Sequence, residues 1–186
     1  MKLVLDTETT GLLKKGLPVD HPSQPRIVQL GAILYSEEGL VRAELNLIVK
    51  PDGWTVPVEA SNVHGITTEI AEQFGVPIAF ALTVLNQLVK LADTVVAHNY
   101  DYDNPVIDGE FARLGKPSPF KDKPNFCTMK AATDVVKEAG PRGFKWPKLQ
   151  STYKFLFGSE FEGAHDAMAD VRACGRIFFE LRKRNS

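Results

Sequence analysis

The sequence predicts an α/β domain in which a mixed β-sheet carries helices on its faces. Three observations support this fold class. Apolar runs and alternating apolar and polar residues, both typical of strands, fill most of residues 1–50. From residue 77 onwards, segments with helical spacing alternate with short apolar runs. The chain has 186 residues and a hydrophobic fraction of 44%, which is enough for one substantial core.

The first part of the chain predicts three strands. Leu3–Leu5 is a short apolar run followed by polar residues, so we expect a buried strand that leaves the core there. Glycines and prolines mark residues 11–26 as an irregular loop. Ile27–Tyr35 and the alternating segment Val41–Val49 flank the turn sequence Glu37–Gly39. This pattern predicts an antiparallel hairpin with one solvent-exposed face.

The second part predicts helices separated by short strands. Apolar residues follow helical spacing over Pro77–Leu91, and Thr94–Ala97 is a second short buried strand. Pro105 suits the first turn of a helix that runs to about Leu114, with Asn104 as its N-cap. The other predicted elements are a strand at Phe126–Cys127 and helices over Thr128–Glu138, Leu149–Leu156 and Asp166–Arg182.

Composition and charge narrow the classes of function. The net charge of −1 argues against a protein that coats nucleic acid through charge alone. Cys127 and Cys174 are too few for a disulfide framework and indicate reduced, buried thiols. We expect a cytoplasmic protein without membrane contact, because the sequence has no signal-peptide pattern and no bilayer-spanning apolar stretch. We see no repeat or linker, so residues 1–186 are predicted to form a single domain.

Two carboxylates near the start of the chain do not fit a purely structural interpretation. Asp6 ends the predicted strand and Glu8 follows two residues later, so an extended backbone points both side chains to the same face. Like charges on one face repel unless a cation lies between them. The alternative is a surface aspartate beside a turn glutamate.

Two further acids and a histidine stand at the ends of predicted elements. Asp170 lies at the edge of the apolar stripe of the last helix, where a buried charge is costly without a partner. The alternative is that Asp170 caps another element. His165 stands just before this helix and is a candidate proton acceptor, because imidazole titrates near neutral pH. Asp103 follows the second buried strand, and its alternative role is helix capping.

Together these residues favour a site for two hard divalent cations. Oxygen ligands and a phosphate substrate favour Mg²⁺ over zinc, with Mn²⁺ as a substitute. The sequence has no Cys/His cluster with zinc spacing. It also has no phosphate-binding glycine loop and no Gly-x-Ser-x-Gly motif.

Three segments resemble the motifs of the DnaQ-like DEDDh exonucleases. Leu5–Gly11 is similar to the first motif, His98–Asp103 to the second and Ala164–Val171 to the third. Val63–Thr67 also resembles a segment that this family places beside the terminal nucleotide. The resemblance covers nearly the whole chain and implies a ribonuclease H-like fold, with a five-stranded mixed sheet flanked by helices.

The resemblance also implies how the acids are used. Asp6, Glu8 and Asp170 would hold the metal ion that activates water, and Asp6 would bridge both ions. Asp103 would support the second ion, and His165 would take the proton from the attacking water. All five would therefore be catalytic residues.

Substrate and products follow from the same resemblance. Thr9 would meet the 3′-hydroxyl end, His64 and Ile66 would bracket the last base, and Asn99 would lie nearby. The implied reaction is 3′-to-5′ hydrolysis of a single-stranded or frayed 3′ end, with release of nucleoside 5′-monophosphates. DNA is favoured over RNA, and a polymerase or repair protein is the partner that the family suggests.

The sequence departs from the family pattern at two places, which leaves substrate choice open. The loop at residues 12–26 is longer than in compact members, and Gln29 stands where many members have an acid. An RNA-trimming exonuclease is one alternative. A non-catalytic nucleic-acid-binding scaffold is another, although loss of a ligand would be its signature. The third is a phosphatase of the Asp-x-Asp type, which fits poorly because position 8 is glutamate.

A basic and aromatic segment is the candidate surface for the phosphate backbone. Lys137–Lys148 contains glycines and prolines that predict a loop. Its basic residues are Lys137, Arg142, Lys145 and Lys148, with Phe144 and Trp146 interleaved. Such aromatic side chains can stack on unpaired bases. The alternative is that Trp146 and Leu149 only pin the loop to the core. The Lys183–Arg184 tail is a weaker candidate.

Overall fold

A five-stranded mixed sheet forms the centre of the molecule. The computed structural model describes residues 1–141 and 143–184. The strands are β1 (Lys2–Thr9), β2 (Ile27–Tyr35), β3 (Val41–Ile48), β4 (Thr94–Ala97) and β5 (Asn125–Cys127), in the order β3-β2-β1-β4-β5. β1–β2 and β2–β3 pair antiparallel, whereas β1–β4 and β4–β5 pair parallel. The predicted mixed five-stranded sheet is confirmed.

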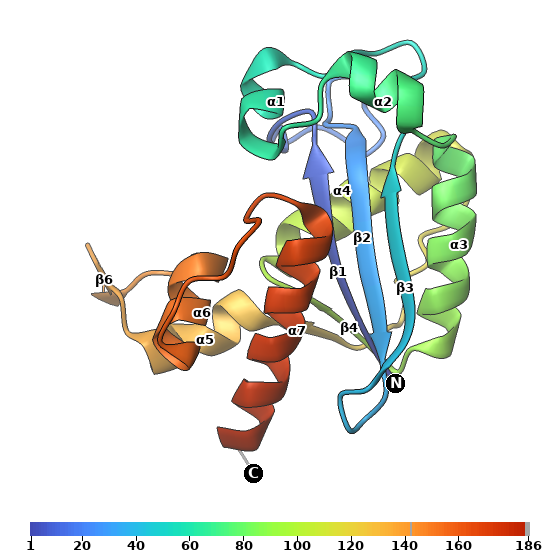
Figure 1. The fold of residues 1–186 in the computed structure, drawn as a ribbon. Helices are drawn as coiled ribbons and strands as arrows, with labels where there is room; N and C mark the ends of the chain where they lie inside the picture. Colours follow the sequence, from blue (N-terminus) through green and yellow to red (C-terminus); the bar gives the residue numbers. More distant parts are fainter. Residues whose placement is uncertain (142, 185–186) are drawn as a thin grey trace.

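Helices cover both faces of this sheet. They are α1 (Val58–His64), α2 (Thr68–Phe74), α3 (Ile78–Leu91), α4 (Tyr100–Arg113), α5 (Thr128–Val136), α6 (Leu149–Phe157) and α7 (Ala167–Arg184). Figure 1 shows α7 crossing one face of the sheet, with α4 behind it on the other. Two apolar clusters correspond to these faces: Leu3 and Leu5 pack on the α3 and α4 side, and Val4 packs with α7.

The expected exposed face of the hairpin is wrong for β2. Every residue of β2 is buried, and exposed positions occur only along the edge strand β3. The physical reason is that β2 lies inside the sheet, with α7 on one face and α3 and α4 on the other. Alternation along the sequence cannot reveal this, because a strand covered on both faces has no polar side.

The predicted start of the fourth helix is also wrong. α4 begins at Tyr100, and its N-cap is Asn99 in a left-handed conformation with φ 83°, which asparagine tolerates well. Asn104 is therefore not a cap, and Pro105 lies inside the helix. A proline there removes the hydrogen bond to the carbonyl of Asp101 and crowds that carbonyl, and the helix nevertheless continues to Arg113.

Two other segments were not anticipated as regular structure. α1 and α2 are seven residues each, and α1 buries none of them, so neither has a long apolar stripe. The expected loop at Lys137–Lys148 contains a small hairpin of β6 (Ala139–Gly140) and β7 (Gly143–Phe144). Arg142 lies outside the described residues. No described helix is long and apolar enough to cross a membrane.

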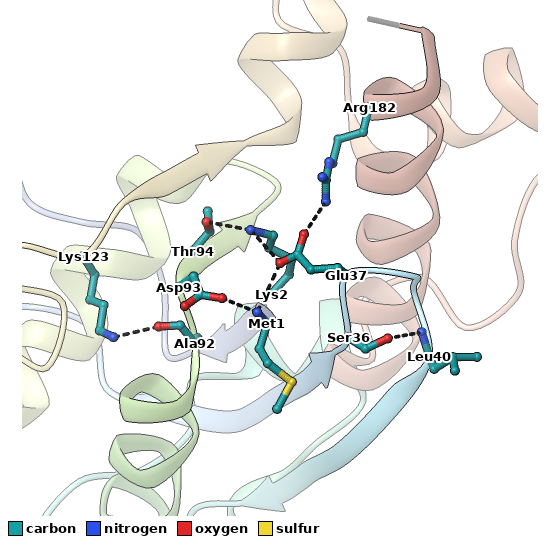
Figure 2. Close-up of polar contacts among 10 residues, drawn as sticks. All are labelled: Met1, Lys2, Ser36, Glu37, Leu40, Ala92, Asp93, Thr94, Lys123 and Arg182. Atoms are coloured by element: carbon teal, nitrogen blue, oxygen red, sulfur yellow. Dashed lines mark hydrogen bonds and ion pairs between the residues drawn. The ribbon is translucent and has the colours of Figure 1, made fainter. Parts of the chain in front are cut away.

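Ion pairs tie together the end of the sheet that carries the N-terminus (Figure 2). Glu37, in the β2–β3 turn, pairs with Lys2 at 3.0 Å and with Arg182 of α7 at 3.2 Å. The Met1 amine pairs with Glu37 and Asp93. Exposed ion pairs contribute little individually. They nevertheless link β1, β2 and α7 at the end opposite α1 and α2.

Close backbone contact brings the start of α7 onto β2. A Cβ added at Gly31 would lie 2.8 Å from the carbonyl carbon and oxygen of Ala167. Only glycine permits this approach, since such distances are far inside van der Waals contact. The first turn of α7 is therefore positioned by the absence of a side chain at position 31.

We expect Gly31→Ala to push α7 away from the sheet. Overpacking of this kind costs about 1–3 kcal/mol in the free energy of unfolding. Urea denaturation should show that loss, and activity should fall with it because α7 carries Asp170. An unchanged unfolding midpoint would contradict the role of this contact.

Candidate active site

β1 presents Asp6 and Glu8 toward α7. Side chains alternate along a strand, so Val4, Asp6 and Glu8 share one face. Val4 packs in the α7-side cluster, which identifies that face. The strand extends through Thr9 rather than ending before Asp6. The expectation that both carboxylates share a face therefore holds on a regular strand backbone.

Asp103 is held by the backbone and side chain of Thr7. β4 ends at Ala97, where its pairing with β1 has reached only Val4. Farther along β1, the Thr7 N–H donates to Oδ1 of Asp103 at 3.1 Å, and the Thr7 hydroxyl donates to the same oxygen at 2.8 Å. Asp103 is 2% exposed and lies in the first turn of α4. It positions a carboxylate beside β1 and is not a helix cap.

The start of α7 brings Asp170 and His165 to Glu8. Ligand atoms of Glu8, His165 and Asp170 all lie within 4.8 Å of one another. His165 has φ 69°, an uncommon conformation for a non-glycine residue, and its side chain is exposed. Oδ1 of Asp170 is buried with no hydrogen-bond partner in the described part of the chain.

A buried amide fixes the beginning of α7. Oε1 of Gln29 accepts from the Ala167 N–H at 3.1 Å, and its Nε2 donates to Asp166 and to Asn46, both at 2.9 Å. Asp166 in turn accepts from the Ala169 N–H at 3.0 Å. Gln29 is 4% exposed, so this network links β2, β3 and α7 inside the protein. An acid at position 29 could not donate to Asp166.

The acids raise one another's pKa values. Burial raises the pKa of Glu8 to about 8, and the charges of Asp170 and Asp103 add to the rise. Burial also raises the pKa of Asp170 to about 7, which the His165 backbone partly offsets. The pKa of Asp6 is raised well above its usual range by burial and by Asp103, Asp170 and Glu8. These carboxylates are crowded more closely than their charges favour.

This donor set fits divalent cations. Oδ1 of Asp170 is buried and has no hydrogen-bond partner among the described residues. Burying such an oxygen costs free energy unless a ligand such as a cation binds it. The raised pKa values of Asp6 and Glu8 also indicate a site for a cation, because burial and neighbouring negative charges both disfavour their ionised forms. Carboxylate oxygens with one imidazole suit a hard ion such as Mg²⁺ or Mn²⁺.

A groove of about 560 Å³ begins at Glu8 and runs between β1 and α1. We call it the end groove, and Thr9, Leu12, Val63, His64 and Tyr102 are among the residues that line it. His64 accepts from the Ile66 N–H at Nδ1, at 3.1 Å, and burial lowers its pKa. Two residues implied beside the terminal nucleotide, Thr9 and His64, therefore lie in one groove.

The remaining two substrate-binding candidates lie elsewhere. Ile66 is 7% exposed and packs with Val28, Val56 and Ala71 in a small core, outside the end groove. Asn99 lines a different groove, together with His165 and Asp170. The substrate contacts of Thr9, His64, Ile66 and Asn99 stay predictions.

Sequence reasoning missed three residues that hold the site. Tyr102 donates to the Gly11 carbonyl at 2.6 Å and contacts the Thr9 hydroxyl at 2.5 Å, which fixes one wall of the end groove. Thr7 and Gln29 position Asp103 and α7. The alternation of β1 offered a signal for Thr7, because it must face away from Asp6. Nothing in the sequence pattern connects Gln29 to α7.

The mixed sheet and the carboxylate cluster define a nuclease-like hydrolase of the ribonuclease H-like class. The RNase T family model, described as an exonuclease, matches residues 3–178. The chain belongs to this exonuclease family, whose members depend on metal ions. The family predicted from the sequence is confirmed.

Several relatives support the same grouping. The chain is 26% identical to the DNA polymerase III subunit epsilon of Buchnera aphidicola subsp. Schizaphis graminum over 95% of this chain and 72% of that protein. It is 29% identical to an uncharacterised exonuclease of Escherichia phage 186, over 98% of this chain and 88% of that protein. Both are similar over most of their lengths.

Solved structures share the fold. Escherichia coli exonuclease I in complex with a dT13 oligonucleotide superposes with a TM-score of 0.78 at 24% identity. The zinc-ion-bound form of its complex with single-stranded DNA gives 0.79. The match covers 98% of this chain but 40% of exonuclease I, so this chain spans less than half the length of that enzyme.

The raised pKa values predict that the metal-free protein loses stability as pH rises. A carboxyl with a raised folded-state pKa keeps its proton when the unfolded chain has lost it, above about pH 4. Stability is therefore greatest at low pH and falls as pH rises through the folded-state values of about 7 to 8. In EDTA, the free energy of unfolding should fall from pH 5 to pH 8.

Asp170→Asn should raise stability at pH 8 relative to the wild type, and it should remove part of the gain that Mg²⁺ gives the wild type. Asp134→Asn, which changes an exposed aspartate on α5, is the matched control. Chemical denaturation at the two pH values measures both effects. A wild-type stability that rises toward pH 8 in EDTA, or a destabilised Asp170→Asn protein there, would contradict the electrostatic account.

Proposed function

We propose that this chain is a metal-dependent 3′-to-5′ exonuclease that releases nucleoside 5′-monophosphates from DNA. The observation that carries the proposal is the convergence of Glu8, His165 and Asp170 at the mouth of the end groove. The end groove begins at the acids, so it can hold the 3′ end of one nucleic-acid strand. Cleavage next to that end removes nucleotides one at a time.

The five residues proposed to be catalytic have two different roles. Asp6, Glu8, Asp103 and Asp170 would hold two divalent ions. When bound, such ions would activate a water molecule as the nucleophile and stabilise the leaving 3′-oxygen. His165 is exposed beside Asp170 and Glu8, so its imidazole can accept the proton of the attacking water and release it to solvent. Mg²⁺ is the proposed ion, and Mn²⁺ should substitute.

The names of the similar proteins favour DNA as the substrate. One is named as a subunit of a DNA polymerase, and the solved exonuclease I holds a DNA oligonucleotide. A single-stranded or frayed 3′ end is the proposed form of the substrate, because a free chain end can enter the end groove. A polymerase or a repair complex is the proposed partner, and the cytoplasm the proposed location. An RNA-trimming role is the competing proposal.

A scaffold function and a phosphatase function have less support. A non-catalytic scaffold would be expected to lose an acid, whereas Asp6, Glu8, Asp103 and Asp170 are all retained. A phosphatase of the Asp-x-Asp type would use an aspartate as a covalent nucleophile, and the exonuclease family match gives no support to that chemistry.

An end-labelling assay tests polarity, substrate and metal together. A 5′-labelled single strand should be shortened stepwise with Mg²⁺, and a strand with a 3′-phosphate should resist, because the groove is expected to meet a free 3′-hydroxyl. Matched DNA and RNA strands measure the preference. EDTA and Asp6→Ala should each abolish shortening.

Two outcomes of this assay would overturn the proposal. Rapid cutting of closed circular single strands would reveal an endonuclease. Full turnover in excess EDTA would remove the metal-dependent mechanism.

His165→Ala should reduce kcat by about 100-fold or more and change KM little, since general bases contribute about 10²–10⁴-fold to rate. Free imidazole added to the assay should restore part of the rate of the variant, because the His165 side chain is exposed and a small base can take its place. His21→Ala, in the loop at residues 12–26, is the control. A variant with the wild-type kcat would show that His165 is not the base.

A further inference from the structure

A second groove meets the acids from the other side. It has a volume of about 370 Å³, and we call it the loop groove. His165 and Asp170 line one part of it, and Trp146 and Lys148 line another. The end groove contains Glu8. Because ligand atoms of Glu8 and Asp170 lie within 4.8 Å of each other, the catalytic cluster lies where the two grooves meet.

Trp146 is not held in the core. Its side chain is 61% exposed, and neighbouring Phe144 is 51% exposed. Leu149 packs into two of the apolar clusters, so Leu149 and not Trp146 attaches this segment to the core. Lys148 is exposed, and no ion pair to it occurs among the described residues, whereas Lys145 pairs with Glu138 at 2.8 Å. The exposed indole of Trp146 can stack on an aromatic ring, and the ammonium of Lys148 can pair with a negative charge. Together they suit a ligand that has both aromatic rings and negative charges.

The base of this segment is fixed by a partly buried histidine. Nε2 of His98 donates to the carbonyl of Pro147 at 3.1 Å, because a carbonyl oxygen only accepts. Nδ1 then accepts from the Thr128 hydroxyl at 2.9 Å. Burial lowers the pKa of His98 to about 4, so the ring stays neutral near pH 7. Trp146 and Lys148, on either side of Pro147, therefore project from an anchored point.

We propose that Trp146 and Lys148 form a binding platform for the unpaired nucleotides on the 5′ side of the scissile phosphate. The inference rests on the proposed exonuclease function. A phosphodiester at the acids has one nucleotide on its 3′ side, assigned to the end groove, and the rest of the strand on its 5′ side. The loop groove also reaches the acids, because Asp170 lines it. The indole stacks on a base and the ammonium pairs with a phosphate.

The platform predicts selectivity for single strands of any sequence. Every base has a ring face that can stack on an indole, so stacking discriminates little between sequences. Bases within a duplex have their faces already covered. A few unpaired nucleotides upstream of the 3′ end are then the unit that the enzyme recognises.

Oligothymidylates of two to eight nucleotides test this directly. For the wild type, kcat/KM should rise with length until the platform is filled. Trp146→Ala should flatten that rise, with a loss on the octamer of about five- to 150-fold, the range for one stacked base. Lys148→Ala should reduce the salt slope of octamer binding by about 0.7, the value for one phosphate contact on a single strand. Phe155→Ala, which removes a 53% exposed aromatic on α6, is the matched control.

A second measurement does not depend on turnover. Trp54 and Trp146 are the two tryptophans, so Trp54→Phe leaves Trp146 as the single tryptophan, which can be excited selectively at wavelengths that tyrosine does not absorb. Octathymidylate in EDTA should quench its emission, and the matching duplex should not. Circular dichroism checks that each variant folds.

The outcomes separate the exonuclease activity from the platform. Absence of shortening by the wild type would overturn the exonuclease proposal itself. Shortening by the wild type, with an unchanged length dependence in Trp146→Ala and an unquenched Trp146, would overturn the platform alone. An equal loss in Phe155→Ala would also overturn it, because the effect would then be a general one of exposed aromatic surface.

Discussion

Burial of several carboxylates, together with their mutual repulsion, is the constraint on which the arrangement of this molecule depends. Glu8, Asp103 and Asp170 have pKa values raised to between about 7 and 8, and the pKa of Asp6 is also raised well above its usual range. Such a cluster opposes folding, so the surrounding structure must hold it in place. β1 and β2 supply that support, because helices cover both faces of the inner sheet. Ion pairs at the far end add ties between β1, β2 and α7.

The alternation of side chains along β1 positions both the acids and a wall of the groove that is proposed to hold the 3′ end of the substrate. Asp6 and Glu8 point to the α7 side of the sheet, where ligand atoms of Asp170 and His165 lie within 4.8 Å of Glu8. Thr7 and Thr9 point to the opposite face, where they contact Asp103 and Tyr102 of α4. One strand therefore carries two of the proposed metal ligands, Asp6 and Glu8, on one face, and on the other face it holds a third, Asp103, together with a wall of the end groove.

Rigid supports carry exposed recognition elements throughout the site. Gln29 and Gly31 fix the start of α7, and the exposed His165 side chain precedes that helix. His98 fixes Pro147, from which exposed Trp146 projects. The positions near the acids are thereby fixed, while the side chains proposed to contact the substrate stay exposed.

The sequence by itself determined the strand and helix order, the shared face of Asp6 and Glu8, the inward position of Asp170 and the exonuclease family. These depend on local periodicity and on short motifs. Only the tertiary structure decided that β2 is covered on both faces, that α4 begins at Tyr100 and that Gln29 caps α7. The same is true of the buried position of Ile66. The physical reason is that these features arise between segments far apart in the chain, such as Gln29 and Ala167, and periodicity reports only how neighbours in sequence share a face.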